Sequence, residues 1–247
     1  MADRDEILAF ADELLELEAY PDYGPMGLQV AGAQEVDRIA CGVSASLALF
    51  ERSAKARAQL LLVHHGLIWD SDPRVIDDAL ARRLKELLDN RITLAAYHLA
   101  LDAHPEIGNN ALLARKLGIE PRDRFLELGF GGPLDEPTDI EEFSARVRDA
   151  LRREPLVFAH GPERIERAAV VTGSAGRYLA AAAHEGYDLF LTGEAMEPTL
   201  HTARELGVHF VAGGHYATET IGIQALAAKL AERFGLEWEF VDLPNPV

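Results

Sequence analysis

The sequence predicts an α/β protein made of two similar halves. Short apolar runs at residues 60–63 and 189–192 are typical of strands that helices cover on both faces. Ala-rich helical stretches alternate with these runs, as parallel sheets require. Residues 41–65 also align without gaps on residues 170–194, at a constant offset. We therefore expect an internal duplication, with one half at residues 1–127 and the other at residues 128–247.

The elements of the first half follow from periodicity and from Gly and Pro. Residues 4–19 carry apolar side chains at helical spacing, and the stretch 21–25, with two prolines and a glycine, predicts a loop. Strands are expected at 36–43, 60–63 and 92–97, and further helices at 46–57, 74–88 and 109–117. Gly118 is suited to end the last of these helices.

In the second half, residues 128–137 are rich in Gly and Pro, which predicts the boundary between the halves. A helix at 140–151 has Thr138 or Asp139 available as its cap. Strands are expected at 156–159, 167–171 and 189–192, and helices at 177–185 and 198–206. Residues 236–241 alternate between apolar and acidic side chains, a pattern typical of an edge or closing strand.

Two adjacent histidines, His64 and His65, end the apolar run of the first half. Ligands of open α/β sheets gather at the carboxyl ends of strands. Because neighbouring side chains at a strand end diverge, this pair suits two metal ions better than one.

A second pattern occurs in both halves. His98 is followed four positions later by Asp102, and His215 is followed four positions later by Glu219. Each pair comes after an apolar strand and before a helix, and the gapless alignment places Glu194 opposite His65. The duplication therefore predicts that these side chains lie at strand ends.

The residue types have coherent metal chemistry. Imidazole suits zinc, iron, nickel or copper, while a carboxylate adds hard oxygen ligands and can bridge two cations. Two ions roughly 3.5–4 Å apart activate one water and polarise the bond that it attacks. Glu219 is a candidate bridge, and His98 is a candidate for orienting a ligand. The alternative is that all of these are hydrogen-bonded strand-end residues without a metal.

Composition excludes several classes of protein. A net charge of −17 argues against binding to duplex nucleic acid, although Arg74, Arg82, Arg83 and Lys85 could contact an anion or form a solvated helix face. Cys41 is the only cysteine, so no disulfide forms within the chain. No apolar run approaches eighteen residues and the start of the chain is charged, so we expect no membrane span, no secretion signal and a cytoplasmic location.

Several motifs together resemble one family. They are Gly27-Leu28-Gln29-Val30, His64-His65-Gly66, His98 with Asp102, Val171-Thr172-Gly173-Ser174-Ala175-Gly176, Thr192-Gly193-Glu194, and Gly214-His215-Tyr216-Ala217-Thr218-Glu219. The chain resembles, over nearly its whole length, the GTP cyclohydrolase 1 type 2 family, also called the Nif-three-like dinuclear metal-centre family.

The resemblance implies a two-part α/β chain assembled as a toroidal homohexamer. It implies two divalent ions per subunit, with zinc, iron, manganese, nickel and cobalt all allowed by the ligand types. By position, His64 and His215 would hold one ion, His65 and Asp102 the other, and Glu219 would bridge them.

The resemblance also implies a function. Our first hypothesis is a metal-dependent hydrolase that acts on a small molecule such as a nucleotide. Hydroxide formed at the metals would attack C8 of the guanine of GTP and open the ring, with His98 or Glu194 as candidate catalytic proton carriers. The alternative hypothesis is a non-catalytic metal-binding or scaffold ring protein.

Overall fold

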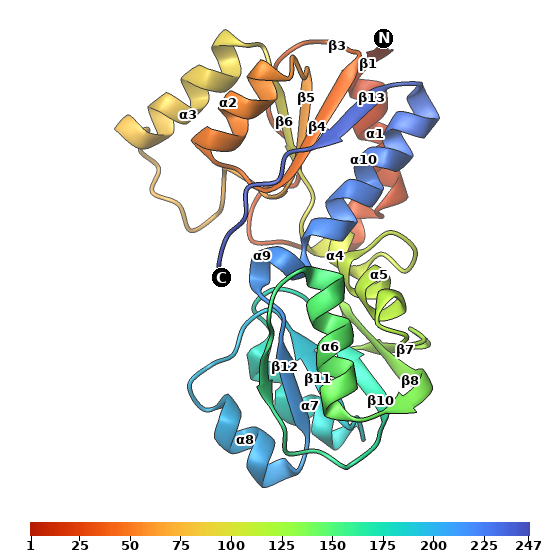
Figure 1. The fold of residues 1–247 in the computed structure, drawn as a ribbon. Coiled ribbons are helices and arrows are strands. Elements are labelled where there is room, and N and C mark those ends of the chain that lie inside the picture. The colour runs from red at the N-terminus through yellow and green to blue at the C-terminus, as the bar shows by residue number, and fades with distance from the viewer. The chain divides into compact units, whose positions relative to one another are not determined.

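The computed structural model describes residues 1–247, which form two compact units. The first unit contains Met1–Leu101 and Gly222–Leu243, and the second contains Asp102–Ile221 and Pro244–Val247. Each unit has a sheet with helices on both faces, which confirms the α/β class (Figure 1). None of the helices combines the length and apolar character that crossing a membrane requires.

The sheet of the first unit has five strands in the order β13-β4-β5-β6-β2. Strands β13, β4, β5 and β6 run parallel, and β2 closes one edge in the antiparallel sense. Their bounds are Glu237–Phe240 for β13, Arg38–Ser44 for β4, Leu60–His65 for β5, Thr93–Ala96 for β6 and Gly27–Val30 for β2. Strands β1 (Ala2–Asp3) and β3 (Glu35–Val36) pair as a separate two-stranded sheet.

Helices cover both faces of this sheet. Helices α2 (Leu47–Lys55) and α3 (Asp78–Asp89) lie on one side, and α1 (Arg4–Leu14) and α10 (Thr220–Phe234) on the other (Figure 1). On the first side, Leu49, Phe50 and Leu87 pack with Leu61 and Val63 of the central strand. Burying each of these side chains stabilises the fold by roughly 1.5–3 kcal/mol.

The sheet of the second unit has six strands in the order β7-β8-β10-β11-β12-β9. The three central strands β10, β11 and β12 are parallel, and the other three are antiparallel to their neighbours. Their bounds are Asp123–Phe125 for β7, Gly129–Thr138 for β8, Ile165–Val170 for β10, Leu189–Thr192 for β11, His209–Ala212 for β12 and Leu156–Phe158 for β9.

Here too the helices form two layers. Helices α5 (Asn109–Lys116) and α6 (Ile140–Leu151) pack on one face of the sheet through Leu113, Phe143 and Val147. Helices α7 (Leu179–His184) and α8 (Thr199–Leu206) pack on the other face through Leu179 and Ala203. Short helical segments complete the chain: η1 (Leu17–Ala19), α4 (Leu99–Ala103), η2 (Gly176–Tyr178) and α9 (His215–Thr218).

Both units contain the same run of elements. In the first it is β4-α2-β5-α3-β6, and in the second it is β10-α7-β11-α8-β12, with all strands parallel in each. This common order is what the sequence alignment of the two halves predicts, while their origin by duplication stays a prediction.

The compact units differ from the division at residue 127. The Gly- and Pro-rich stretch expected to be a boundary forms most of β8 inside the second unit. Helix α5 buries Leu113 and Ala114 in the core of the second unit, whereas α10 and β13 return to the first. The helix that follows each His motif thus belongs to the other unit.

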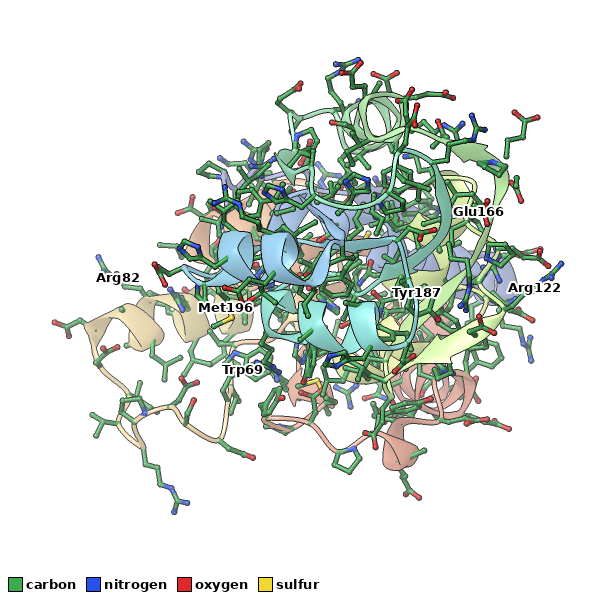
Figure 2. The ribbon with its side chains drawn as sticks, turned by 90° about the horizontal axis from the view of Figure 1, so that it is seen from below. Trp69, Arg82, Arg122, Glu166, Tyr187 and Met196 are labelled. Carbon is green, nitrogen blue, oxygen red and sulfur yellow. The ribbon has the colours of Figure 1, made fainter.

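The helix expected at 74–88 begins later, at Asp78. The Asp77 side chain accepts a hydrogen bond from Leu80 N at 2.8 Å and caps the helix there. Arg74 therefore lies outside the helix, while Arg82 bonds its own helix backbone and Lys85 pairs with Asp89 one turn on. Arg82 lies at the outer surface in Figure 2, as the solvated-face interpretation requires.

Candidate metal-binding residues

Three imidazoles gather at the carboxyl end of the first unit's sheet. His64 and His65 are the last two residues of β5, and His98 follows β6 by two positions. One ring nitrogen of each lies within 4.8 Å of those of the other two. The ring centroids of His64 and His65 are 4.9 Å apart, and that of His98 is 5.0 Å from His64. We call His64, His65 and His98 the histidine cluster.

Each imidazole of the histidine cluster is held at Nδ1 by a different segment. His64 Nδ1 donates to the carbonyl oxygen of Tyr97 at 2.9 Å, which leaves the lone pair on Nε2. His65 Nδ1 is 3.1 Å from Ser44 Oγ of the neighbouring strand β4. His64 and His65 are thus anchored toward opposite neighbours of β5, but their rings do not diverge as the sequence predicts, since the ring centroids are only 4.9 Å apart. Histidines that bind metals are typically oriented through their other nitrogen in this way.

Asp22 anchors the third imidazole. Its Oδ1 accepts a hydrogen bond from His98 Nδ1 at 2.8 Å, and its Oδ2 accepts one from Leu99 N at 2.9 Å. Burial favours the neutral acid, but the hydrogen bond and charge of His98, with two backbone N–H groups, lower the pKa of the Asp22 carboxyl. Asp22 is therefore an anion that keeps a proton on Nδ1 of His98.

Gln29 and Gly66 hold the loop after the histidine pair. Gln29 Oε1 accepts from Leu67 N at 2.7 Å and from Ile68 N at 3.3 Å, while its Nε2 donates to Pro25 O at 2.8 Å. A Cβ at position 66 would overlap Gln29 Nε2, so a larger residue there would displace this hydrogen-bonded amide. Gln29 and Gly66, which belong to two different motifs of the resemblance, therefore lie against each other in the fold.

In the second unit, His215 lies between two carboxylates. Its Nδ1 bonds Glu194, and its Nε2 is 3.2 Å from Glu219 Oε2. Burial disfavours a charged imidazole, but hydrogen bonds and charge from Glu219 and Glu194 outweigh it and raise the pKa of His215 to about 9. The surroundings of His215 thus attract a positive charge.

Asp102 supplies a further buried carboxylate near Glu219. One oxygen of each lies within 4.8 Å of the other, and the two residues are only 6% and 2% exposed. Asp102 Oδ1 accepts a hydrogen bond from Asn109 Nδ2 at 2.8 Å. Since α5 begins at Asn109, the helix after the first His motif positions this acid in the second unit.

The Gly-rich turn after β10 packs directly against these acids. Gly173 has a positive φ of 67°, and a Cβ there would overlap Glu219 Oε1. Thr172 N bonds Asn110 Oδ1 at 2.6 Å, and Gly173 N bonds Thr218 Oγ1 at 3.2 Å. The turn therefore fixes both the backbone that precedes Glu219 and the space that its carboxylate occupies.

The donor set of both units fits a divalent transition metal. Imidazole nitrogens and carboxylate oxygens suit zinc, iron, manganese, nickel or cobalt. Burying Asp102 and Glu219 close together is unfavourable for two anions unless a cation compensates their charge. The ligand types, their burial and their anchoring all agree with such a cation.

The first unit also has a cavity away from the histidine cluster. Its volume is about 600 Å³, and it is lined by residues that include Gln59 and Arg91. These residues precede β5 and β6, so the cavity opens at the amino ends of the strands, whereas the histidine cluster lies at their carboxyl ends. The cavity is therefore at the opposite end of the strands from the histidine cluster.

The structure brings the predicted residues into one group per unit. His64, His65 and His98 form the group of the first unit, and Asp102, Glu194, His215 and Glu219 form that of the second. Sequence reasoning did not find Asp22 or Ser44, because neither has a spacing that links it to the histidines. The only signal for Asp22 is its place in a Pro-flanked loop, which is too common to indicate a role.

The fold and these residues together define an α/β protein with buried His and carboxylate groups that could bind metal. The family model for Duf34/NIF3 (NGG1p interacting factor 3) matches residues 2–246. The chain therefore belongs to the DUF34/NIF3 family, which confirms the resemblance seen in its motifs.

Relatives of known name cover almost the full chain. A protein of Pseudomonas aeruginosa is 46% identical over 245 residues, covering 96% of this chain and 95% of the relative. One of Escherichia coli K12 is 43% identical over 242 residues, covering 98% of both. Both are named GTP cyclohydrolase 1 type 2 homolog.

Solved structures share the fold. The protein ybgI, described as of unknown function, matches with a TM-score of 0.97 at 42% identity over all of both chains. TTHA1606 from Thermus thermophilus matches with a TM-score of 0.93 at 35% identity, also over all of both chains. HcgD from Methanocaldococcus jannaschii, at 24% identity and a TM-score of 0.86 over 98% of both chains, shares the fold.

Proposed function

We propose that the protein is a metal-dependent hydrolase whose divalent ions are held by His64, His65, Asp102, His215 and Glu219. The observation that carries the proposal is the histidine cluster, in which every imidazole is held at Nδ1. Divalent ions bound by these residues would acidify a water and polarise the bond under attack.

The chain's own residues would position ligands and carry protons. Hydrolysis of a carbon–nitrogen bond adds the water oxygen to carbon and a proton to nitrogen. Asp22 keeps His98 protonated at Nδ1, so Nε2 of His98 is the atom that can take a proton from water and return it to the leaving nitrogen. Glu194 bonds His215 and would orient that ligand, and as a proton carrier it stays a prediction.

The names of the relatives suggest the substrate class. Both relatives described above are GTP cyclohydrolase 1 type 2 homologs, so we propose a purine nucleotide, with GTP as the first compound to test. Opening of its five-membered ring between C8 and N9 would convert the purine to a formamide. This change alters the ultraviolet absorbance of the base and can be followed directly.

The test compares His64→Ala with His201→Ala, an exposed histidine on α8. Protein loaded with Zn²⁺, Mn²⁺ or Fe²⁺ is analysed for bound metal and for turnover of GTP. Wild type and His201→Ala should retain metal and open the ring. His64→Ala should lose bound metal and at least about 100-fold in turnover, because one imidazole ligand is gone.

Metal retained by wild type without turnover of GTP or any other purine nucleotide would contradict the hydrolase and leave the non-catalytic metal-binding or scaffold alternative. Equal metal content in wild type and His64→Ala would contradict the ligand assignment. Light scattering on the same samples tests the toroidal homohexamer, which stays part of the proposal.

A further inference from the structure

We propose that Tyr23 and Trp69 form a stacking platform for a planar heterocyclic ring beside the histidine cluster. The inference rests on the proposed function and names the part of the substrate that the platform holds. Both side chains come from loops at the carboxyl end of the first unit's sheet, one before β2 and one after β5. Trp69 is labelled in Figure 2.

Both aromatic rings lie against His98. The Trp69 ring centroid is 5.3 Å from that of His98, with an interplanar angle of 83°. The Tyr23 ring is 6.3 Å from the same imidazole and is tilted by 55°. A ring held on this platform would therefore lie next to the residue that we propose carries the proton.

The platform is rigid before any ligand arrives. Trp69 Nε1 donates to Gly66 O at 3.1 Å, which fixes the indole. Asp22 Oδ1 accepts from Tyr23 N at 2.7 Å as well as from His98, so one carboxylate positions Tyr23 and His98 together. Asp70 N donates to Tyr23 O at 2.8 Å and ties the two loops to each other. Prior ordering of this kind lowers the cost of binding.

Tyr23 is nonetheless exposed. Its side chain shows 61% of its surface, although its backbone is hydrogen bonded on both sides. A large aromatic ring held in place and open to solvent offers a face on which a π-system can stack. Stacking on aromatic side chains is tolerant of the identity of the base, because every nucleobase has such a face. The ligand class that fits is a planar heterocycle, such as a purine.

The test follows the fluorescence of Trp69 with guanosine 5′-monophosphate as the probe. Trp238→Phe removes the other tryptophan, and dialysis against EDTA removes metal. The probe should quench Trp69, and ribose 5-phosphate, which has no aromatic ring, should not. Tyr23→Ala should weaken binding roughly 5- to 150-fold, the range for loss of one stacked base, while Tyr23→Phe should bind like wild type.

Tyr20→Ala, in the same segment, is the matched control, and thermal unfolding confirms that each variant is folded. Binding that is unchanged in Tyr23→Ala, or equal for ribose 5-phosphate, would overturn the platform. Binding that depends on Tyr23 without turnover by the metal-loaded protein would leave the platform standing and contradict the hydrolase. Turnover by the metal-loaded protein with a KM that Tyr23→Ala does not change would support the hydrolase and contradict the platform.

Discussion

Every imidazole of the histidine cluster is held by a group from another segment of the chain. The Nδ1 atoms of the three rings are hydrogen bonded to Tyr97 O, Ser44 Oγ and Asp22 Oδ1, respectively. A side chain that is already fixed loses little rotamer freedom when it binds, a saving of roughly 0.5–1.5 kcal/mol for each side chain. The histidine cluster is therefore preorganised to bind a metal ion.

Gly173 allows a separate test of the acids in the second unit. Gly173→Ala would place a Cβ against Glu219 Oε1, so we expect at least about a tenfold loss in Zn²⁺ affinity by calorimetry. Gly186→Ala is the matched control, because Gly186 also has a positive φ of 78° but meets only Arg167 Nη1, at 3.8 Å.

Both alanine variants should lose about 1–2 kcal/mol in unfolding free energy from left-handed backbone strain. Only Gly173→Ala should lose metal affinity. An equal loss of Zn²⁺ affinity in both variants, or no loss in either, would show that Glu219 is not a ligand.

Candidate ligands were easier to predict from the sequence than their anchors. His64, His65, His98 and His215 each stand at or just after an apolar strand, and strand ends are where such residues act. Asp22 reaches His98 only because two loops distant in sequence meet in the fold. No local pattern contains that contact, so reading the sequence alone could not supply it.

At the scale of elements, apolar periodicity located most strands and helices to within a few residues. Strand β8 was missed because its glycines and prolines resemble a linker. Its glycines are needed for close packing: a Cβ at Gly131 would overlap the Tyr187 side chain, and one at Gly132 would overlap Glu120 O. Gly131 and Gly132 pair with Ala169 and Ala168 of β10 across the sheet. This close approach of other segments to β8 arises from tertiary packing, which composition does not reveal.

Strand β4 carries the one cysteine and provides a probe of the first sheet. Cys41 is fully buried, and burial, reinforced by the Glu239 carboxylate, raises the pKa of its thiol far above the usual value. Because a raised pKa keeps the thiol protonated, we expect native protein to resist Ellman's reagent even at pH 9. In guanidinium chloride one thiol per chain should react.

Fast labelling of the native protein at pH 9 would contradict the buried position of Cys41 in β4. The labelling rate in mild denaturant would instead report opening of the first sheet.

At the scale of the whole chain, each unit contains segments from both sequence halves. The first unit is completed by Gly222–Leu243, and the second unit takes in α5 from the first half. The sequence predicted two halves of similar element order, and that order is present. The sequence could not predict the units themselves, because the apolar face of α5 or α10 could pack on either sheet.

This arrangement makes a prediction about fragments. Residues 1–127 alone lack β13, which pairs with β4, and α10, whose Phe234 packs edge-on to Phe10 with ring centroids 5.8 Å apart. We expect the fragment to be unfolded or aggregated, with Cys41 accessible to Ellman's reagent.

The control is a permuted chain that joins residues 222–243 ahead of residues 1–101, which keeps every segment of the first unit. Its circular dichroism should show cooperative unfolding. A stable, cooperative 1–127 fragment with a protected Cys41 would show that the C-terminal segment is dispensable.

The return of β13 to the first sheet also sets the order in which the protein can mature on the ribosome. Translation proceeds at about 5–20 residues per second, and domains usually fold in the order in which they emerge. Here β13, at Glu237–Phe240, emerges after residues 102–221 of the second unit, and until then the edge of its partner β4 stays unpaired. The unit that starts first therefore cannot be completed until nearly the whole chain has been made, and during that interval its open edge can pair with other chains.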